Sequence, residues 1–213
     1  MPHRTASTIR ELLDRNRQWA ESRAEEDPTF FARHAAGQAP PFLYIGCSDS
    51  RVPPTDIVAA GPGDLFVTRN IANLVKPDDI GLRSVLEYGV HVLKVEHVIV
   101  CGHTECGGVM ASLAEDPLPG FLGAWLHSLR QLADRSREEL SKLEGKARVD
   151  RMVELNVESQ VRTLAQLDVM KRAWDSGRQL QIHGWVYGLD GGRVRDLLTL
   201  TAENQTQEVI AAE

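Results

Sequence analysis

The sequence predicts an α/β fold with a mainly parallel central sheet flanked by helices on both faces. Short apolar runs alternate with segments of helical periodicity along most of the chain, which is the pattern of strands joined by crossover helices. Two of the apolar runs, residues 42–45 and 98–101, lead directly into side chains that can bind a metal. At the carboxyl ends of parallel strands such side chains lie together, and sheets of this kind bind their ligands there.

An N-terminal helical arm is predicted first. A capping box, Thr8 with Glu11, begins a helix whose apolar residues fall near helical spacing. These residues are Ile9, Leu12, Leu13 and Trp19. Asp27-Pro28 supplies the first residues of a second helix, and Gly37 is placed to end it. Residues 1–37 are therefore expected to be the arm of one domain that spans residues 1–213.

The middle of the chain supplies the parallel strands and their connections. Short apolar runs predict strands at residues 42–45 and 65–68. Apolar residues on one helical face then predict a helix over residues 79–94. The run at residues 98–101 predicts a buried strand that delivers His103 to its carboxyl end.

Helices and a hairpin are predicted for the rest of the chain. In order they are a short helix after Gly108, a helix through residues 121–132, an exposed polar stretch at 136–146, and a long amphipathic helix over 149–174. Residues 180–187 and 194–200 predict two strands, and Asp190-Gly191-Gly192 between them favours an antiparallel hairpin.

Composition argues against several classes of partner. Lysine and arginine number 24 and aspartate and glutamate 30, for a formal charge of −6, and the basic residues are scattered. This balance argues against nucleic acid or an anionic membrane as a partner. No apolar run approaches the ~18 residues of a membrane span, and the first residues lack the apolar core of a signal peptide. The chain is therefore expected to be cytoplasmic. Its three cysteines, an odd number, do not suit a disulfide framework.

Two short segments carry the chemistry. Cys47 is followed by Asp49 and Arg51, and His103 is followed by Cys106. Two thiolates and one imidazole, with a fourth position left open, are the ligand set of a catalytic zinc site. A structural zinc site would need four ligands in tight pairs such as Cys-x2-Cys, and the sequence has no such pair. We therefore expect one Zn²⁺ per subunit, held by Cys47, His103 and Cys106.

Each of these residues also has an ordinary structural interpretation. The two cysteines could be buried as small hydrophobic residues, and the histidine could be hydrogen-bonded at a strand end. The aspartate and arginine could form a simple ion pair. The placement of both segments after predicted strands favours the metal site. Cys101 is different, because it lies inside an apolar run and is expected to be a core residue.

Longer motifs around these residues resemble the β-class carbonic anhydrases. They are CSDSRV at residues 47–52, RNIAN at 69–73 and GHTECGG at 102–108, with GQxP at 37–40 and HGWxYG at 183–188. The resemblance implies four parallel strands with an antiparallel addition, and N-terminal helices that pack on a partner subunit of a homodimer or tetramer. It also implies zinc-dependent, reversible hydration of carbon dioxide to bicarbonate and a proton.

The expected chemistry is attack on carbon dioxide by zinc-bound hydroxide, because zinc lowers the pKa of bound water towards about 7. Two thiolates cancel the formal charge of the ion, so activity is expected to favour mildly alkaline pH. Asp49 is expected to accept a hydrogen bond from the hydroxide, and Arg51 to hold that carboxylate ionised through a bidentate pair. The resemblance also allows a closed form in which Asp49 takes the fourth zinc position.

Further residues match positions that line the carbon dioxide pocket in the β class. They are Phe66, Ile71 and Tyr88, with Gln38 at the pocket's edge. Gly107 and Gly108 are also expected at the pocket, because small residues let the amide end of the following helix approach the site. From the sequence alone, Phe66, Ile71 and Tyr88 are expected to be core residues, and Gln38 could be a loop residue. The two glycines could simply begin a helix.

A second set of residues matches an inhibitory bicarbonate site found in some bacterial relatives. Arg69 and Tyr187 agree with that site, but Tyr44 stands where the relatives have tryptophan. A phenol hydroxyl donates along a different direction from an indole N–H, so inhibition by bicarbonate is expected to be weak.

Other functions could use a similar zinc site. A hydrolase of carbonyl sulfide or carbon disulfide would use the same zinc site on another linear substrate. A non-enzymatic zinc or redox protein would not need the Asp49–Arg51 pair. An alcohol dehydrogenase can share the ligand set, but no Gly-x-Gly-x-x-Gly follows any predicted strand.

Overall fold

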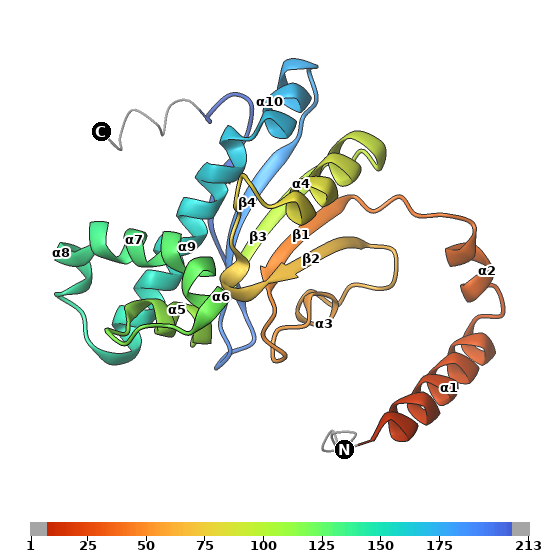
Figure 1. Ribbon diagram of the computed structural model, residues 1–213. Helices are drawn as coiled ribbons and strands as arrows, with labels where there is room; N and C mark the ends of the chain where they lie inside the picture. The colour runs from red at the N-terminus through yellow and green to blue at the C-terminus, as the bar shows by residue number, and fades with distance from the viewer. Residues whose placement is uncertain (1–7, 206–213) are drawn as a thin grey trace. The chain divides into compact units, whose positions relative to one another are not determined.

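Five strands form one sheet in the order β2-β1-β3-β4-β5 in the computed structural model, which describes residues 8–205 (Figure 1). The strands are β1 Phe42–Cys47, β2 Leu65–Asn70, β3 His97–His103, β4 Gln181–Tyr187 and β5 Val194–Leu200. The first four are parallel to one another, and β5 is antiparallel to β4. The predicted fold class is confirmed, including the antiparallel addition.

The strands follow from their sequences. β1 and β3 are continuous apolar runs and are buried almost throughout, as expected for central parallel strands. β4 alternates between buried and partly exposed residues. The turn between β4 and β5 contains Gly192 at φ 64°, a left-handed conformation that glycine adopts at low cost.

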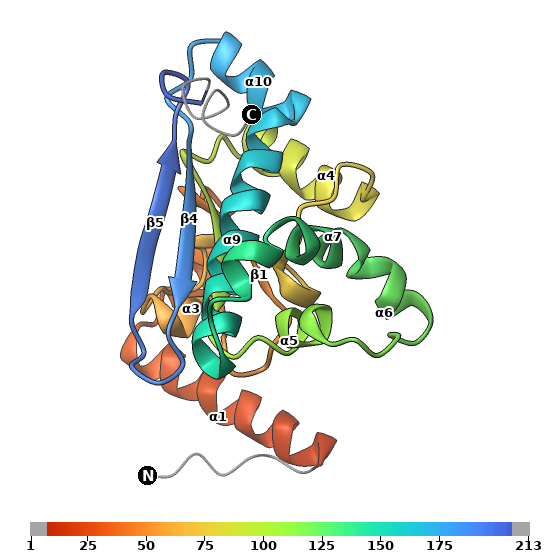
Figure 2. The same cartoon turned by 90° about the vertical axis from the view of Figure 1, so that its left-hand side faces the viewer.

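Ten helical segments within residues 39–205 connect and cover the strands. They are α3 Pro54–Ile57, η1 Ile71–Asn73, α4 Ile80–Glu87, η2 Tyr88–Val92, α5 Gly107–Leu113, α6 Gly120–Trp125, α7 His127–Arg135, α8 Arg137–Leu140, α9 Gly145–Gln166 and α10 Asp168–Asp175. Figure 2 shows α9 lying along one face of the sheet, with α4, α5 and α7 on the same side. No helix among residues 8–205 is long and apolar enough to cross a membrane.

The two faces of the sheet are covered unequally. Alternate residues of β1 and β3, such as Leu43 and Val98, join the large core formed with α4, α5, α9 and α10. The other face carries a small cluster of Tyr44, Ile99 and Cys101, with Ile57 of α3 packed against it. Cys101 is therefore buried, as expected. The short helix α3 packs on this second face, whereas most of the helices and most of the hydrophobic core lie on the first.

Three predicted segments differ in detail from the structure. The helix expected over residues 149–174 is divided into α9 and α10, because Leu167 is extended at ψ 141°. The apolar period continues across this break, so the sequence gives no sign of it. The helix expected over 79–94 ends in the π-helical turn η2. The stretch 136–146 is not wholly exposed, since it contains α8, whose Leu140 is buried.

The chain consists of two compact units, Met1–Gln38 and the sheet-bearing unit Ala39–Glu213. The smaller unit contains α1 Ile9–Glu26 and α2 Phe30–Ala35. The predicted capping box is present, since Glu11 N–H donates to Thr8 Oγ1 at 3.1 Å and Thr8 N–H to Glu11 Oε2 at 3.0 Å. Neither helix has a buried residue. The single-domain interpretation and the packing of this arm on a partner stay predictions.

Candidate metal centre

Three side chains converge at the carboxyl ends of two neighbouring strands. Cys47 is the last residue of β1, His103 is the last residue of β3, and Cys106 precedes the first residue of α5. Because β1 and β3 are adjacent and parallel, their ends meet. One sulfur or nitrogen atom of each residue lies within 4.8 Å of the other two. All three side chains are buried, so the arrangement is a compact and largely dry donor set.

The imidazole of His103 is oriented for coordination. Its Nδ1–H donates to the carbonyl of Thr104 at 2.8 Å, which leaves Nε2 with its lone pair free. Nε2 is buried and has no hydrogen-bond partner among residues 8–205. Thr104 is fixed in turn, because its hydroxyl accepts from Leu189 N–H at 2.9 Å and its own N–H donates to the Tyr187 carbonyl at 3.0 Å. A buried nitrogen without a partner is costly unless a metal occupies that position.

The two thiols also fit a cation. Their sulfur atoms lie 3.9 Å apart. The hydrogen bond between them lowers the pKa of Cys47 and raises the pKa of Cys106, so without metal the pair shares one proton. A divalent ion favours both as thiolates, because its charge replaces that proton. The donor set of two sulfurs and one imidazole nitrogen suits zinc.

Asp49 and Arg51 form the expected bidentate pair beside this group. Arg51 Nε donates to Asp49 Oδ1 at 3.0 Å and Nη2 to Oδ2 at 2.7 Å, and the Arg51 backbone N–H adds a bond of 2.9 Å to Oδ1. These hydrogen bonds, above all those of the guanidinium, hold the pKa of Asp49 well below its usual range. Asp49 Oδ2 lies 3.8 Å from His103 Nε2. The carboxylate is therefore ionised and close to the donor set.

Two arginines tie the backbone around the centre. Arg51 Nη2 also donates to the Glu105 carbonyl at 3.2 Å, in a loop where Glu105 adopts φ 54°. Arg69 donates from Nε to the Cys47 carbonyl at 2.8 Å and from Nη2 to the Asp49 carbonyl at 2.6 Å. Arg69 was singled out in the sequence for regulation. In the structure its guanidinium binds the backbone of the segment that carries Cys47 and Asp49.

The residues expected to line a substrate pocket are only partly brought together. The rings of Phe66 and Tyr88 have centroids 5.7 Å apart. Gly108 lies against η1, where an added Cβ would come within 3.0 Å of Ile71 Cγ2 and of Ala72 Cβ. Ile71 and Tyr88 are 43% and 45% exposed, so the expectation that they are core residues was wrong for the isolated chain. Gly107 begins α5 in open space, and Gln38 belongs to the N-terminal unit.

Tyr44 and Tyr187 of the expected regulatory trio share the small cluster on the second sheet face. The Tyr44 ring covers Gly46, where a Cβ would lie 2.5 Å from Tyr44 Cε1. Burial, chiefly, raises the pKa of the Tyr44 phenol far above its ordinary value, and the nearby charge of Arg69 opposes that rise. The three residues are therefore neighbours, with Tyr44 as a buried neutral phenol.

A buried polar network behind the centre was missed from the sequence. Asn156 Nδ2 donates to the Ala72 carbonyl at 3.0 Å, and Gln160 Oε1 accepts from Val75 N–H at 2.8 Å. Gln160 Nε2 also donates to Asn156 Oδ1 at 2.9 Å. Both residues lie on the buried side of α9. Two amides at i and i+4 among the apolar residues of a helix were the signal that could have revealed them.

An α/β fold with a buried Cys-His-Cys donor set and a neighbouring carboxylate–guanidinium pair defines a class of zinc enzymes. A family model described as carbonic anhydrase matches residues 42–194. The chain belongs to the carbonic anhydrase family, in its β class. It is an enzyme whose general function is the zinc-dependent, reversible hydration of carbon dioxide; the alternative of a carbonyl sulfide or carbon disulfide hydrolase is not favoured.

Individual relatives agree with this assignment. A carbonic anhydrase of Emericella nidulans is 42% identical over 187 residues, covering 87% of this chain and 82% of the relative. One from Pseudomonas aeruginosa is 41% identical, covering 77% of this chain and 76% of its own.

Solved structures give the same result. A Coccomyxa β-carbonic anhydrase in complex with acetazolamide has a TM-score of 0.90 at 37% identity, covering 97% of this chain and 98% of its own. A tetrameric β-carbonic anhydrase of Sordaria macrospora has a TM-score of 0.88 at 40% identity, covering 92% of this chain and 100% of its own.

Proposed function

We propose that Cys47, His103 and Cys106 are the zinc ligands of this carbonic anhydrase. The observation that carries the proposal is the convergence of their donor atoms within 4.8 Å, with His103 Nε2 buried and unpaired among residues 8–205. Zinc supplies a Lewis acid that lowers the pKa of a water molecule towards neutrality. The burial of the three side chains keeps bulk water away from the donor atoms and strengthens electrostatic interactions there.

Asp49 and Arg51 are the catalytic pair in this proposal. Asp49 stays ionised because Arg51 lowers its pKa, so the carboxylate acts as a hydrogen-bond acceptor throughout the neutral and alkaline range. Oδ2, at 3.8 Å from His103 Nε2, is positioned to accept a hydrogen bond from the attacking nucleophile and to orient it. Arg51 acts through Asp49. The closed form, with Asp49 as a fourth ligand, stays a prediction; Asp49 is outside the group of three donors.

Carbon dioxide is small and uncharged, so its binding site needs apolar walls close to the metal. Phe66, Tyr88, Ile71 and the start of α5 at Gly107 and Gly108 supply such walls in the proposal. The glycine at 108 is required there, because a side chain would meet η1 at 3.0 Å. Gln38 is proposed as a polar residue at the edge of the pocket.

Self-association is part of the proposal. The Sordaria relative is tetrameric, and α1 leaves Ile9, Leu12 and Leu13 at 74%, 54% and 60% exposed. A homodimer, or a dimer of dimers, would bury this surface.

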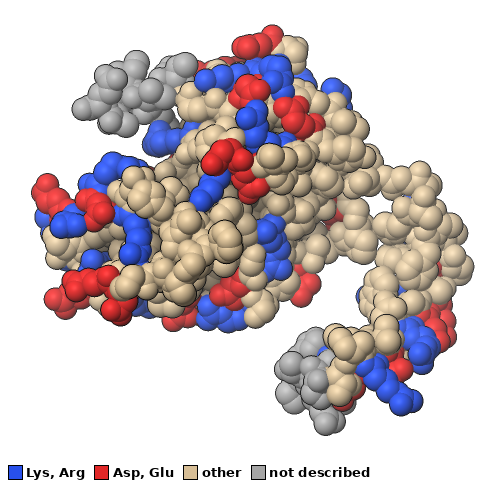
Figure 3. Space-filling view, in the orientation of Figure 1, with Lys and Arg blue, Asp and Glu red and all other residues tan. Residues whose placement is uncertain are grey.

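A cytoplasmic location is proposed because all three cysteines are free and two of them must be reduced to bind zinc. Acidic and basic side chains are interspersed on the face seen in Figure 3, and no nucleic acid or membrane is proposed as a partner.

The decisive test replaces Cys106 with serine and measures zinc content together with carbon dioxide hydration by stopped flow across pH. Loss of most of the zinc and of the activity is expected. Cys101→Ser is the matched control, because Cys101 is also buried but lies outside the donor group; it should keep a full equivalent of zinc. Full zinc at wild-type affinity in the Cys106 variant would overturn the assignment.

A further inference from the structure

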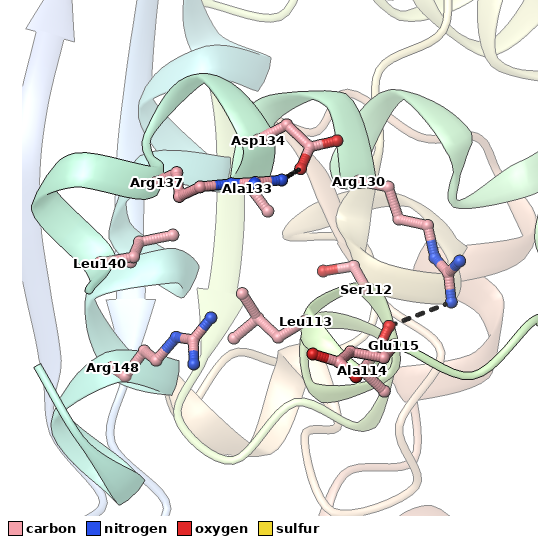
Figure 4. A pocket seen from close by; sticks show the side chains of 10 residues that line it. All are labelled: Ser112, Leu113, Ala114, Glu115, Arg130, Ala133, Asp134, Arg137, Leu140 and Arg148. Carbon is pink, nitrogen blue, oxygen red and sulfur yellow. Dashed lines mark hydrogen bonds and ion pairs between the residues drawn. The ribbon is translucent and has the colours of Figure 1, made fainter.

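A cavity of about 510 Å³ lies at the opposite end of α5 from the metal centre (Figure 4). It is bounded by the end of α5 and by α7, α8 and the start of α9. α5 has 7 residues, and at a rise of about 1.5 Å per residue the cavity begins roughly 10 Å along the helix from Cys106. It is therefore separate from the catalytic site. Its volume falls in the range of small-molecule sites, about 300–1,000 Å³.

Arginines from three helices face this cavity. Arg130 comes from α7, Arg137 from α8 and Arg148 from α9. Arg130 Nη2 donates to the Asp116 carbonyl at 2.6 Å, which ties this side chain to the loop after α5, and its Nε is buried without a partner among residues 8–205. Arg137 Nη2 pairs with Asp134 at 2.6 Å. Figure 4 shows the guanidinium of Arg148 directed into the cavity.

Arg148 is the group that lacks a partner. No side-chain hydrogen bond or ion pair to Arg148 exists within the described part of the chain, although two carboxylates, Glu115 and Asp134, line the same cavity. Asp134 is already neutralised by Arg137. With three guanidinium groups and two carboxylates on its walls, the cavity carries one excess positive charge.

Part of the cavity lining is apolar. Leu113, Ala133 and Leu140 line it, and Leu140 is fully buried. An exposed arginine alone would be an ordinary solvated side chain. An unpaired guanidinium in a hollow with excess positive charge and some apolar lining is instead a place where an anion gains a charge-assisted hydrogen bond. A short hydrocarbon body on that anion would contact Leu113 and Ala133.

We propose that this cavity is a binding site for a small organic anion, with Arg148 as the main contact to its carboxylate or phosphate group. Arg130 provides a second positive charge, because its partner is a neutral carbonyl whereas Arg137 is paired with Asp134. Glu115 weakens the site by repulsion. The site is independent of the catalytic chemistry, since none of these residues contacts the Cys47–His103–Cys106 group. In Figure 3 charged side chains of both signs gather over the region of α7 and α8.

Isothermal titration of the zinc-loaded enzyme tests the proposal. Two anions are used as probes: succinate, a carboxylate with a hydrocarbon body, and inorganic phosphate, which represents the phosphate group alone. Tetramethylammonium chloride at the same ionic strength is the control for cations and salt. Saturable binding of succinate or phosphate is expected. Arg148→Gln should weaken it at least about tenfold, the loss of one charge-assisted hydrogen bond. Glu115→Gln should strengthen it, because it removes a negative charge.

Arg135→Gln is the matched control, since Arg135 is an exposed arginine of α7 that does not line the cavity. It should bind as the wild type does. An anion that binds at the metal centre would bind the wild type and Arg148→Gln equally. Only the part of the binding that Arg148→Gln removes is therefore assigned to the cavity. Binding that is equal in wild type and Arg148→Gln, or no saturable binding of either anion, would overturn the proposal. Equal binding of tetramethylammonium would overturn it too.

Discussion

At the scale of single residues, the metal centre depends on groups that hold the donors without being donors themselves. Thr104 fixes the ring of His103, and Arg69 and Arg51 bind backbone carbonyls on either side of the donor segments. Arg51 has two tasks, because the same Nη2 contacts Asp49 and the Glu105 carbonyl. A loss of either arginine would therefore disturb the geometry of the centre as well as its charge.

Asp49→Asn should keep zinc but lower carbon dioxide hydration by roughly 10²-fold. An amide presents only one acceptor oxygen and has no charge to stabilise the aligned nucleophile. Because the pKa of Asp49 is depressed, the wild type should show no loss of activity from titration of this group in the neutral and alkaline range. Stopped-flow rates and zinc content measured on the same preparation check both parts. Near-normal turnover would remove Asp49 from the mechanism.

Tyr44→Trp should strengthen inhibition by bicarbonate, which is expected to be weak in the wild type. The buried phenol stays protonated, since burial raises its pKa, but it interacts with the Cys101 thiol. An indole N–H would donate along a different direction, towards the neighbourhood of Arg69. Hydration rates against added bicarbonate in both proteins decide this. Strong, cooperative inhibition of the wild type that is unchanged in the variant would show that the substitution is neutral.

At the scale of elements, α9 is the support of the segment that follows β2. Ala72 and Asn73 adopt φ 65° and 47°, a left-handed conformation that is unfavourable for alanine and better tolerated by asparagine. Asn156 and Gln160 bind the backbone of this segment at Ala72 and Val75. The pKa of the Cys47 thiol is lowered mainly by its hydrogen bond with Cys106, and a backbone hydrogen bond from Ala72 makes a smaller contribution in the same direction. A helix remote in sequence thus stabilises a strained turn next to Cys47, a proposed zinc ligand.

Asn156→Leu should lower the free energy of unfolding by about 2 kcal/mol or more, because it leaves the Ala72 carbonyl and Gln160 Nε2 buried without partners. It should also weaken zinc binding, since the Ala72 turn is no longer held. Urea unfolding and competition with a zinc chelator measure the two effects. Thr163→Val is the control, because it removes a hydrogen bond to the Ser159 carbonyl on the same helix without contact to the turn. Equal zinc affinity in Asn156→Leu and wild type would contradict the coupling.

The sequence predicted the elements where local patterns and tertiary structure agree. The capping box at Thr8, the apolar run before Cys47 and the terminal hairpin are all present. The convergence of Cys47, His103 and Cys106 could be predicted, because the first two end predicted parallel strands and the third follows within three residues. The break at Leu167 and the role of Asn156 could not be found, because the first interrupts no apolar period and the second contacts a residue far away in the chain.

At the scale of the whole molecule, the isolated chain leaves much apolar surface exposed. On α4 and η2, Ile80 and Val92 are 81% and 61% exposed, beside Tyr88 of the expected pocket. The aromatic residues of the N-terminal unit contact one another, with Trp19 packed edge-on against Phe30 and Phe31. Surfaces of this kind are commonly covered by a second copy of the chain.

The enzyme should therefore sediment as a homodimer or a larger assembly at micromolar concentration. Replacement of Leu12 and Leu13 by glutamate should shift the mass towards the monomer, because charges on the apolar side of α1 oppose burial against a partner. Activity should fall with it, since Gln38, expected at the pocket edge, follows the same arm. Glu25→Gln, an exposed change on α1, should leave the mass unchanged. A monomeric wild type would refute self-association. Full activity of that monomer would also show that the exposed apolar surface has no role in catalysis.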